Sequence, residues 1–96
     1  SQATENRVYL GTITNVFNKI SVAEARIQTA QELRVGDRIQ VTGQTTGVYN
    51  DTLGEMRLDR GSIDIVRQGD VFSFKTSNLL HRGDKLYRVD RVIDEY

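Results

Sequence analysis

The sequence predicts an all-β fold, and three observations predict it. Short runs rich in Val, Ile, Thr, Tyr and Phe recur along most of the chain, and these β-branched and aromatic residues favour strands. Turn signals interrupt the runs roughly every ten residues, a spacing typical of a β-barrel or a β-sandwich. Proline is absent and glycine occurs eight times, so glycine marks the turns.

Composition limits the kinds of function that we expect. The 96 residues provide one domain with a modest core, and 27% charged and 38% hydrophobic residues are typical of an ordered globular chain. Thirteen basic residues balance thirteen acidic ones, so net charge does not predict binding to nucleic acid or anionic membrane, although a local basic patch stays open. The absence of cysteine excludes disulfides and thiolate chemistry and favours a cytoplasmic location.

The first elements follow from hydrophobic patterning. Residues 1–6 are polar and patternless, so we expect a linker or chain end there and a single domain over 7–96. In a strand over 7–17 the apolar phase slips between Leu10 and Ile13, and Gly11 at the slip predicts a bulge. Asn18-Lys19 then turns the chain into a strand over 20–28.

Further elements complete the predicted fold. Strand 20–28 has Ala23, Ala25 and Ile27 alternating with charged residues, which predicts one buried face. Residues 29–32 are expected to form a short helical turn. Strands are then expected over 38–42, with Ile39 and Val41 inward, over 48–58, over 71–75 and over 86–93, with 63–66 a strand or a connector.

The tripeptide x-Gly-Asp occurs three times, each time just ahead of a β-rich run, as Val35-Gly36-Asp37, Gln68-Gly69-Asp70 and Arg82-Gly83-Asp84. Glycine supplies the positive φ of a tight turn, and the aspartate accepts hydrogen bonds from nearby backbone amides. We therefore interpret these tripeptides as turns that lead into strands rather than as binding motifs.

The ordered series of short motifs resembles the C-terminal domain of the collagenase-like peptidase family (peptidase family U-32), which in turn resembles the second domain of elongation factor Tu. The motifs that carry the resemblance are Gly11-Thr-Ile-Thr, Lys19-Ile-Ser-Val-Ala23, Leu33-Arg-Val-Gly-Asp-Arg-Ile39, Gly43-Gln-Thr-Thr46, Glu55-Met56, Gly69-Asp70 and Arg82-Gly-Asp-Lys-Leu-Tyr-Arg-Val89. The loops around residues 47–54 and after Leu58 depart from the family pattern.

The resemblance implies a closed six-stranded antiparallel β-barrel without a catalytic site of its own. Full-length members of the family are peptidases, some are collagenases and some resemble RNA-hydroxylation enzymes, and their catalytic region resembles a separate upstream α/β-barrel. The chain is then an accessory domain that aids substrate or partner recognition for an upstream catalytic domain. The alternative is a stand-alone module, like those of translation factors, that binds RNA or protein.

Catalytic and cofactor sites are not expected in this chain. Without cysteine, and with His81 as the one histidine, nucleophilic hydrolysis would need a serine, histidine and acid in register. We find no serine in the strained turn that exposes a nucleophile, so we interpret His81 as an exposed loop residue. Neither a metal nor another cofactor is predicted, and no apolar run approaches the roughly 18 residues of a membrane span.

RNA or partner contact is a weaker expectation, since guanidinium groups bind phosphate and carboxylate and exposed rings stack on bases. Neighbouring acidic residues leave ion-paired strand surfaces as the simpler explanation of the arginines. The candidates for contact are Lys19, Arg38, Tyr49, Arg57, Arg60 and Arg88, with Phe17 and Tyr87 as further stacking platforms.

Overall fold

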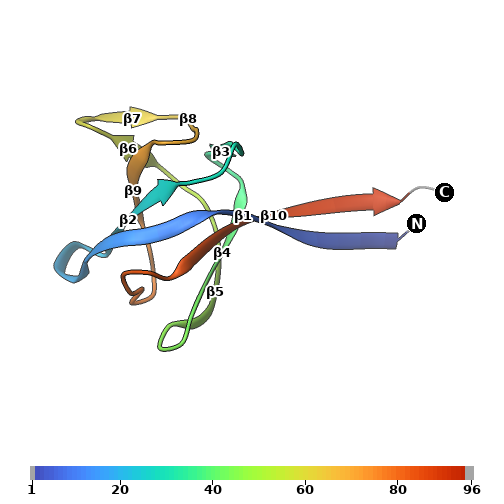
Figure 1. Cartoon of the computed structure of the whole chain (residues 1–96), viewed down its shortest axis with the longest axis horizontal. Coiled ribbons are helices and arrows are strands. Elements are labelled where there is room, and N and C mark those ends of the chain that lie inside the picture. The colour runs from blue at the N-terminus through green and yellow to red at the C-terminus, as the bar shows by residue number, and fades with distance from the viewer. Residues whose placement is uncertain (1, 95–96) are drawn as a thin grey trace.

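A computed structural model describes residues 2–94 and confirms the all-β prediction. These residues form ten strands and one short 3₁₀ helix, and Figure 1 shows the start of β1 and the end of β10 side by side at one end of the molecule. The elements are β1 (Gln2–Phe17), η1 (Asn18–Ile20), β2 (Val22–Ile27), β3 (Leu33–Arg34), β4 (Arg38–Gly43), β5 (Gly47–Thr52), β6 (Met56–Leu58), β7 (Gly61–Ile63), β8 (Ile65–Val66), β9 (Val71–Lys75) and β10 (Lys85–Asp94).

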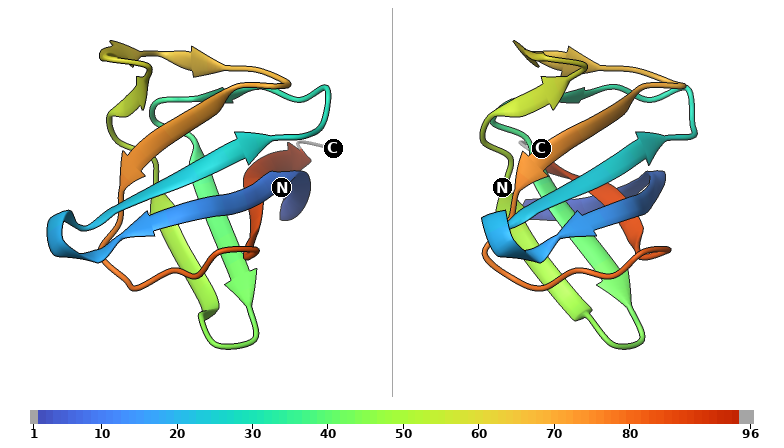
Figure 2. Two further views of the ribbon diagram at one scale, coloured as in Figure 1. Left: turned by 60° about the vertical axis from the view of Figure 1, so that its left-hand side comes forward. Right: turned by 90° about the vertical axis from the view of Figure 1, so that its left-hand side faces the viewer.

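The predicted closed six-stranded barrel is wrong, because the main sheet remains open. Eight strands pair antiparallel in the order β5-β4-β10-β1-β2-β9-β6-β7, and β3 pairs separately with β8. Within residues 2–94, no ladder joins β5 to β6, β7 or β9. Figure 2 shows how strongly the sheet nevertheless curls.

The sheet stays open because the strand expected over 48–58 is interrupted at residues 53–55. Its first part, β5, pairs with β4, and its second part, β6, pairs with β9. Between them, the buried Leu53 turns its backbone away from both ladders: its N–H donates to Asp37 O at 2.8 Å, and its carbonyl accepts from Gly36 N at 2.8 Å. The segment that contains β5 and β6 thus pairs with strands toward both ends of the strand order without joining the two ends into a barrel.

Two local predictions differ from the structure. Residues 2–6, expected as a linker, continue β1 and pair with residues 90–94 of β10, forming a two-stranded ribbon that projects from the body (Figure 1). Polar residues form a strand here because β10 supplies a partner, which composition does not reveal. Residues 29–32 form no helical turn, and the one helical turn among the described residues lies at Asn18–Ile20.

The bulge predicted at Gly11 is confirmed. The β1–β10 register shifts between Tyr9 and Gly11. A Cβ atom at Gly11 would lie 1.8 Å from the carbonyl oxygen of Arg26 on β2. The close approach of two backbones therefore requires glycine at this position.

The predicted inward positions of β2 and β4 are confirmed, since Ala23, Ala25 and Ile27 are fully buried. The alanines lie opposite Phe74 and Phe72 of β9, so their small side chains leave room for two large rings on the inner face. The buried core comprises Leu10, Ile13, Ala23, Ala25, Ile27, Leu33, Ile39, Val41, Tyr49, Leu53, Met56, Val66, Phe72, Phe74, Leu80 and Leu86.

The three x-Gly-Asp turns are confirmed and share one geometry. Gly36, Gly69 and Gly83 have φ of +94°, +91° and +89°, as the third position of a type II turn requires. In each turn one carboxylate oxygen of the aspartate accepts a hydrogen bond of 2.8 Å from the backbone N–H three residues earlier. The repeat is therefore a recurring structural turn.

We predict that Gly69→Ala lowers the free energy of unfolding by about 1–2 kcal/mol, the cost of placing a side chain at positive φ. Gly54→Ala is the matched control, because neither glycine has an atom within 4 Å of an added Cβ and only Gly69 has positive φ. Urea denaturation checks this, and equal losses for both variants would contradict the turn assignment.

Candidate functional site

A row of polar and aromatic side chains crosses the outer face of four adjacent strands. The ladders place Tyr9 of β1 opposite Tyr87 of β10, Tyr87 opposite Gln40 of β4, and Gln40 opposite Asn50 of β5. Their sequence neighbours Leu10, Val41, Tyr49 and Leu86 point into the core, so the row faces solvent. We call Arg7, Tyr9, Gln40, Asn50 and Tyr87 the aromatic–amide face.

Hydrogen bonds and ring contacts order this face. The guanidinium carbon of Arg7 lies 4.4 Å from the ring centroid of Tyr87, a cation–π distance. The rings of Tyr87 and Tyr9 meet edge to face, with centroids 5.6 Å apart. Arg7 Nη1 donates to Gln40 Oε1 at 3.1 Å, and Gln40 Nε2 donates to Asn50 Oδ1 at 2.9 Å. A ligand would therefore meet side chains that are already held in place.

Positive charge borders the aromatic–amide face. Lys85, in the next row of β10, is exposed beside a shallow groove of about 540 Å³ that Thr42, Gly43, Val48 and Gly83 also line. On the other side, the ion pair between Arg38 and Glu5 measures 2.7 Å. The hydrogen bond from Arg38 and its charge, together with the charge of Arg91, lower the pKa of Glu5. The face thus combines planar groups with the cations Arg7 and Lys85, neither of which forms an ion pair among the described residues.

A second polar cluster joins the loop after β4 to the turn before β10. The ring nitrogen Nδ1 of His81 lies 2.7 Å from Thr46 Oγ1, and the Thr46 hydroxyl is also bonded to Asp84 Oδ2. Asp84 is only 6% exposed and also accepts from the His81 backbone N–H. A Cβ at Gly43 would approach Asp84 Oδ1 to 1.9 Å, so glycine there admits the carboxylate.

His81 was expected to be an exposed loop residue, but it is partly buried in this cluster. The Thr46 hydroxyl donates its single proton to Asp84 Oδ2, so its oxygen is left to accept from Nδ1–H of His81. In a nucleophilic triad the histidine instead takes the hydroxyl proton, and the acid holds the other ring nitrogen. The hydrogen bonds among Thr46, His81 and Asp84 therefore hold two loops together, and we call these three residues the latch.

The six residues predicted for RNA or partner contact lie on different elements. Tyr49 is 4% exposed, so its ring forms part of the core and is not a surface platform. Arg38, Arg57 and Arg88 form ion pairs with Glu5, Glu55 and Asp90, respectively. Lys19 on η1 and Arg60 in the β6–β7 turn are exposed. The aromatic–amide face shares none of these six, though it contains the predicted platform Tyr87.

Arg88 holds a loop against the sheet. Its guanidinium pairs with Asp90 at 2.7 Å and donates to the carbonyl oxygen of Glu32 at 2.5 Å and to Gln31 Oε1 at 3.1 Å. The hydrogen bond to Asp90 raises the pKa of Arg88, and the same bond lowers the pKa of Asp90. The guanidinium N–H groups of Arg88 therefore make their hydrogen bonds within the domain.

Within residues 2–94, no group of three His, Cys, Asp or Glu side chains is arranged to hold a metal ion. The same residues contain no helix with the length and hydropathy of a membrane span.

Comparison with solved structures defines the class of fold. The C-terminal domain of a U32 peptidase of Geobacillus thermoleovorans superposes with a TM-score of 0.77 at 13% sequence identity, over 83% of this chain and 90% of that domain. A selenomethionine variant of the same domain gives the same TM-score over 98% of its length. The fold is thus the all-β fold of that domain.

Sequence relatives lead to the same family, although no protein-family model matches the chain. A collagenase of Porphyromonas gingivalis is 34% identical over 91 residues, which are 95% of this chain and 22% of that protein. An uncharacterized protease of Methanocaldococcus jannaschii is 29% identical over 91% of this chain and 21% of its own length. The predicted resemblance to the C-terminal domain of the collagenase-like peptidase (U32) family is confirmed, while the likeness to elongation factor Tu stays a prediction.

The chain spans about a fifth of the length of these two relatives. Their names therefore describe proteins of which this chain matches one part.

We predict that Thr46→Val lowers the free energy of unfolding by about 1–3 kcal/mol, because it leaves a buried carboxylate without its hydroxyl donor. Thr45→Val is the control, since Thr45 lies exposed in the same loop. Thermal or urea unfolding checks the difference. A Thr46 variant as stable as the Thr45 variant would contradict the latch.

The Arg88–Asp90 pair predicts an acid dependence of stability. Because the pKa of Asp90 is lowered from its usual value of 3.8, the pair stabilises the fold above that pH. This contribution is lost as the pH falls through the lowered pKa. Asp90→Asn should flatten this part of the stability profile, measured by urea unfolding between about pH 2.5 and 5.

Arg88→Gln, which removes the partner, should flatten the same part of the profile. An unchanged acid limb in both variants would show that the ion pair does not contribute.

Proposed function

We propose that this chain is a non-catalytic accessory domain of a cytoplasmic collagenase-like peptidase protein, and that the aromatic–amide face recognises the polypeptide on which an upstream catalytic domain acts. The observation that carries the proposal is the combination of a match over 95% of this chain with a match over 22% of a collagenase. Most of the length of such a relative lies outside the matched part and is available for a catalytic domain.

The face suits an extended polypeptide. Peptide groups need donors and acceptors at regular spacing, and Gln40 and Asn50 supply both on neighbouring strands. Tyr9 and Tyr87 offer ring surface at a low entropic cost, and Arg7 and Lys85 attract carboxylates. Since internal contacts already orient Arg7 and Gln40, binding would order few additional side chains.

RNA is the second candidate ligand, in a stand-alone or RNA-modifying protein. The observation in its favour is the guanidinium of Arg7 over the ring of Tyr87, with the exposed Lys85 two residues before Tyr87 on β10. A base could stack on the free side of the guanidinium, and phosphates could lie along the cations.

We predict that the chain binds gelatin and that Arg7→Ala and Tyr87→Ala each weaken the affinity about tenfold, since Tyr and Arg at interface centres contribute well over 1 kcal/mol. Biolayer interferometry on immobilised gelatin measures this. Arg60→Ala is the control, because Arg60 is an exposed arginine in the distant β6–β7 turn.

A parallel titration with unmodified tRNA at 50 and 300 mM salt separates the candidates. Salt-sensitive tRNA binding that Arg7→Ala weakens, without gelatin binding, would replace polypeptide by RNA as the ligand. Binding to neither ligand, or equal losses in all three variants, would contradict recognition by this face.

A further inference from the structure

Apolar side chains gather at the end of the domain that carries η1. Phe17, Ile20 and Leu79 are 41%, 65% and 56% exposed, and the half-buried Val22 lies between them. We call these four residues the apolar tip. Single exposed apolar residues are ordinary on a protein surface, but a contiguous group marks an interaction site.

Two hollows meet at Val22 and make the apolar tip contiguous. The smaller has a volume of about 100 Å³; Phe17, Val22 and Leu79 form its apolar side together with Val16, and uncharged polar residues (Asn18, Ser21, Thr76, Ser77 and Asn78) line the rest. The larger, of about 410 Å³, lies between Ile20, Val22 and Phe74. For scale, a cavity of about 150 Å³ holds a benzene molecule, so the smaller hollow suits one aliphatic side chain.

Cations surround the apolar tip. Lys19 lies within η1, and Lys75 lines the larger hollow. Both are exposed and form no ion pair within residues 2–94. Arg82 approaches from the turn before β10, where its Nη2 donates to Asn15 Oδ1 at 3.4 Å.

The carboxylates nearby are fewer than the cations. Glu55 accepts from the Ser62 hydroxyl at 2.8 Å and pairs with Arg57 at 3.2 Å, and these bonds, together with the charge of Lys75, lower its pKa. Glu24 accepts a hydrogen bond from Thr14. Four cations, counting Arg57, therefore face two carboxylates, and a ligand with negative charge beside an apolar group is complementary to this surface.

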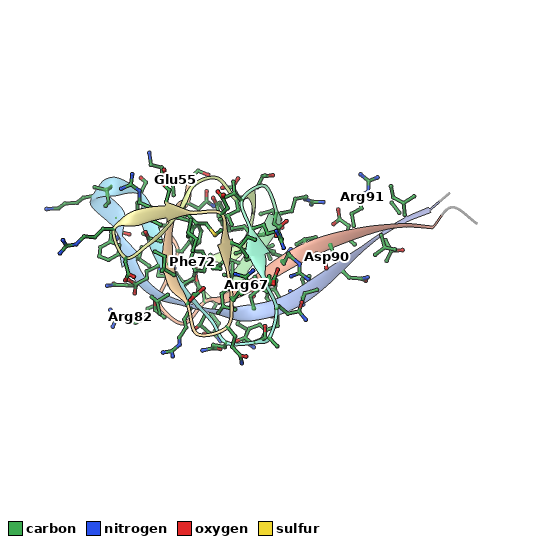
Figure 3. All side chains as sticks on the ribbon, turned by 90° about the horizontal axis from the view of Figure 1, so that it is seen from above. Glu55, Arg67, Phe72, Arg82, Asp90 and Arg91 are labelled. Carbon is green, nitrogen blue, oxygen red and sulfur yellow. The ribbon has the colours of Figure 1, made fainter. Side chains whose placement is uncertain are left out.

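The apolar tip lies at the end of the molecule opposite to the ribbon of β1 and β10. Figure 1 shows the β1–β2 turn at one end of the longest axis, which extends 47 Å, and the two chain ends at the other. In Figure 3, Arg82 lies toward the first end and Arg91 toward the second. A partner at the apolar tip would not compete with contacts made near the chain ends.

We propose that the apolar tip binds an extended segment of a protein partner in which a leucine-like side chain lies between carboxylates. The aliphatic side chain enters the hollow beside Val22, and the carboxylates lie against Lys19 and Lys75. A second copy of the domain is the poorer occupant, because two tips with surplus positive charge repel each other. The site goes beyond the proposed function and stands independently of it.

The probe is the peptide Glu-Glu-Leu-Glu-Glu-amide with fluorescein on its N-terminal amine, titrated with the 96-residue chain and followed by anisotropy. We expect binding that Leu79→Ser and Ile20→Ser each weaken at least fivefold. Lys19→Glu combined with Lys75→Glu should abolish it. Val48→Ser, an equally exposed valine on β5, should leave it unchanged.

Two further peptides test the chemistry, with Ser in place of Leu or with Lys in place of every Glu. Both should bind at least tenfold more weakly. Equal binding of the Lys peptide, no binding of the Glu peptide, or loss in the Val48 variant would overturn the proposal. A dimer in sedimentation that Ile20→Ser dissociates would assign the apolar tip to a second copy and overturn it equally.

Discussion

The ladder between β1 and β10 is the interaction on which the rest of the structure depends. It runs from the chain ends through the body, and both of its strands continue the sheet, β10 to β4 and β1 to β2. The bulge at Gly11 sets its register. Because a shift of one residue would move every side chain to the opposite face, this register decides that Leu10 and Leu86 fill the core while Tyr9 and Tyr87 face outward.

The same ladder explains why the candidate sites lie where they do. The aromatic–amide face is assembled from positions that are far apart in sequence and adjacent across the strands. The latch of Thr46, His81 and Asp84 lies in the loops that precede β5 and β10, and the apolar tip combines the ends of β1 and β2 with η1 and the loop before β10. The strands thus present one surface, and the connections between them present another, as is common where a scaffold supports binding.

Local features of the fold could be predicted from the sequence, and non-local ones could not. The alternation around Ala23 and Ala25, the strand over 71–75 and the turns at Gly36, Gly69 and Gly83 depend on neighbouring residues. The interruption at Leu53 depends on hydrogen bonds to Gly36 and Asp37, and the strand at residues 2–6 depends on a partner near the other chain end. Neither dependence is visible in a local pattern.

In the candidate site, too, local features could be predicted from the sequence and non-local contacts could not. Sequence reasoning selected charged and aromatic residues by type, so it included Tyr49, whose ring is buried, and missed Arg7, Tyr9 and Gln40. The alternation of apolar and polar residues along each strand indicates that the missed residues face outward. Only the register between strands shows that they lie next to one another. His81 was likewise read from its neighbours in sequence, whereas its partner Thr46 lies 35 residues away.

The most direct test of this account is a map of amide chemical-shift changes in ¹⁵N-labelled protein on addition of soluble gelatin peptides. Recognition by the aromatic–amide face predicts one contiguous set of changes at Arg7, Tyr9, Gln40, Asn50 and Tyr87, on four strands that the ladders bring side by side. Changes confined to the surface around Arg57 and Arg60, or spread evenly over the domain, would contradict it.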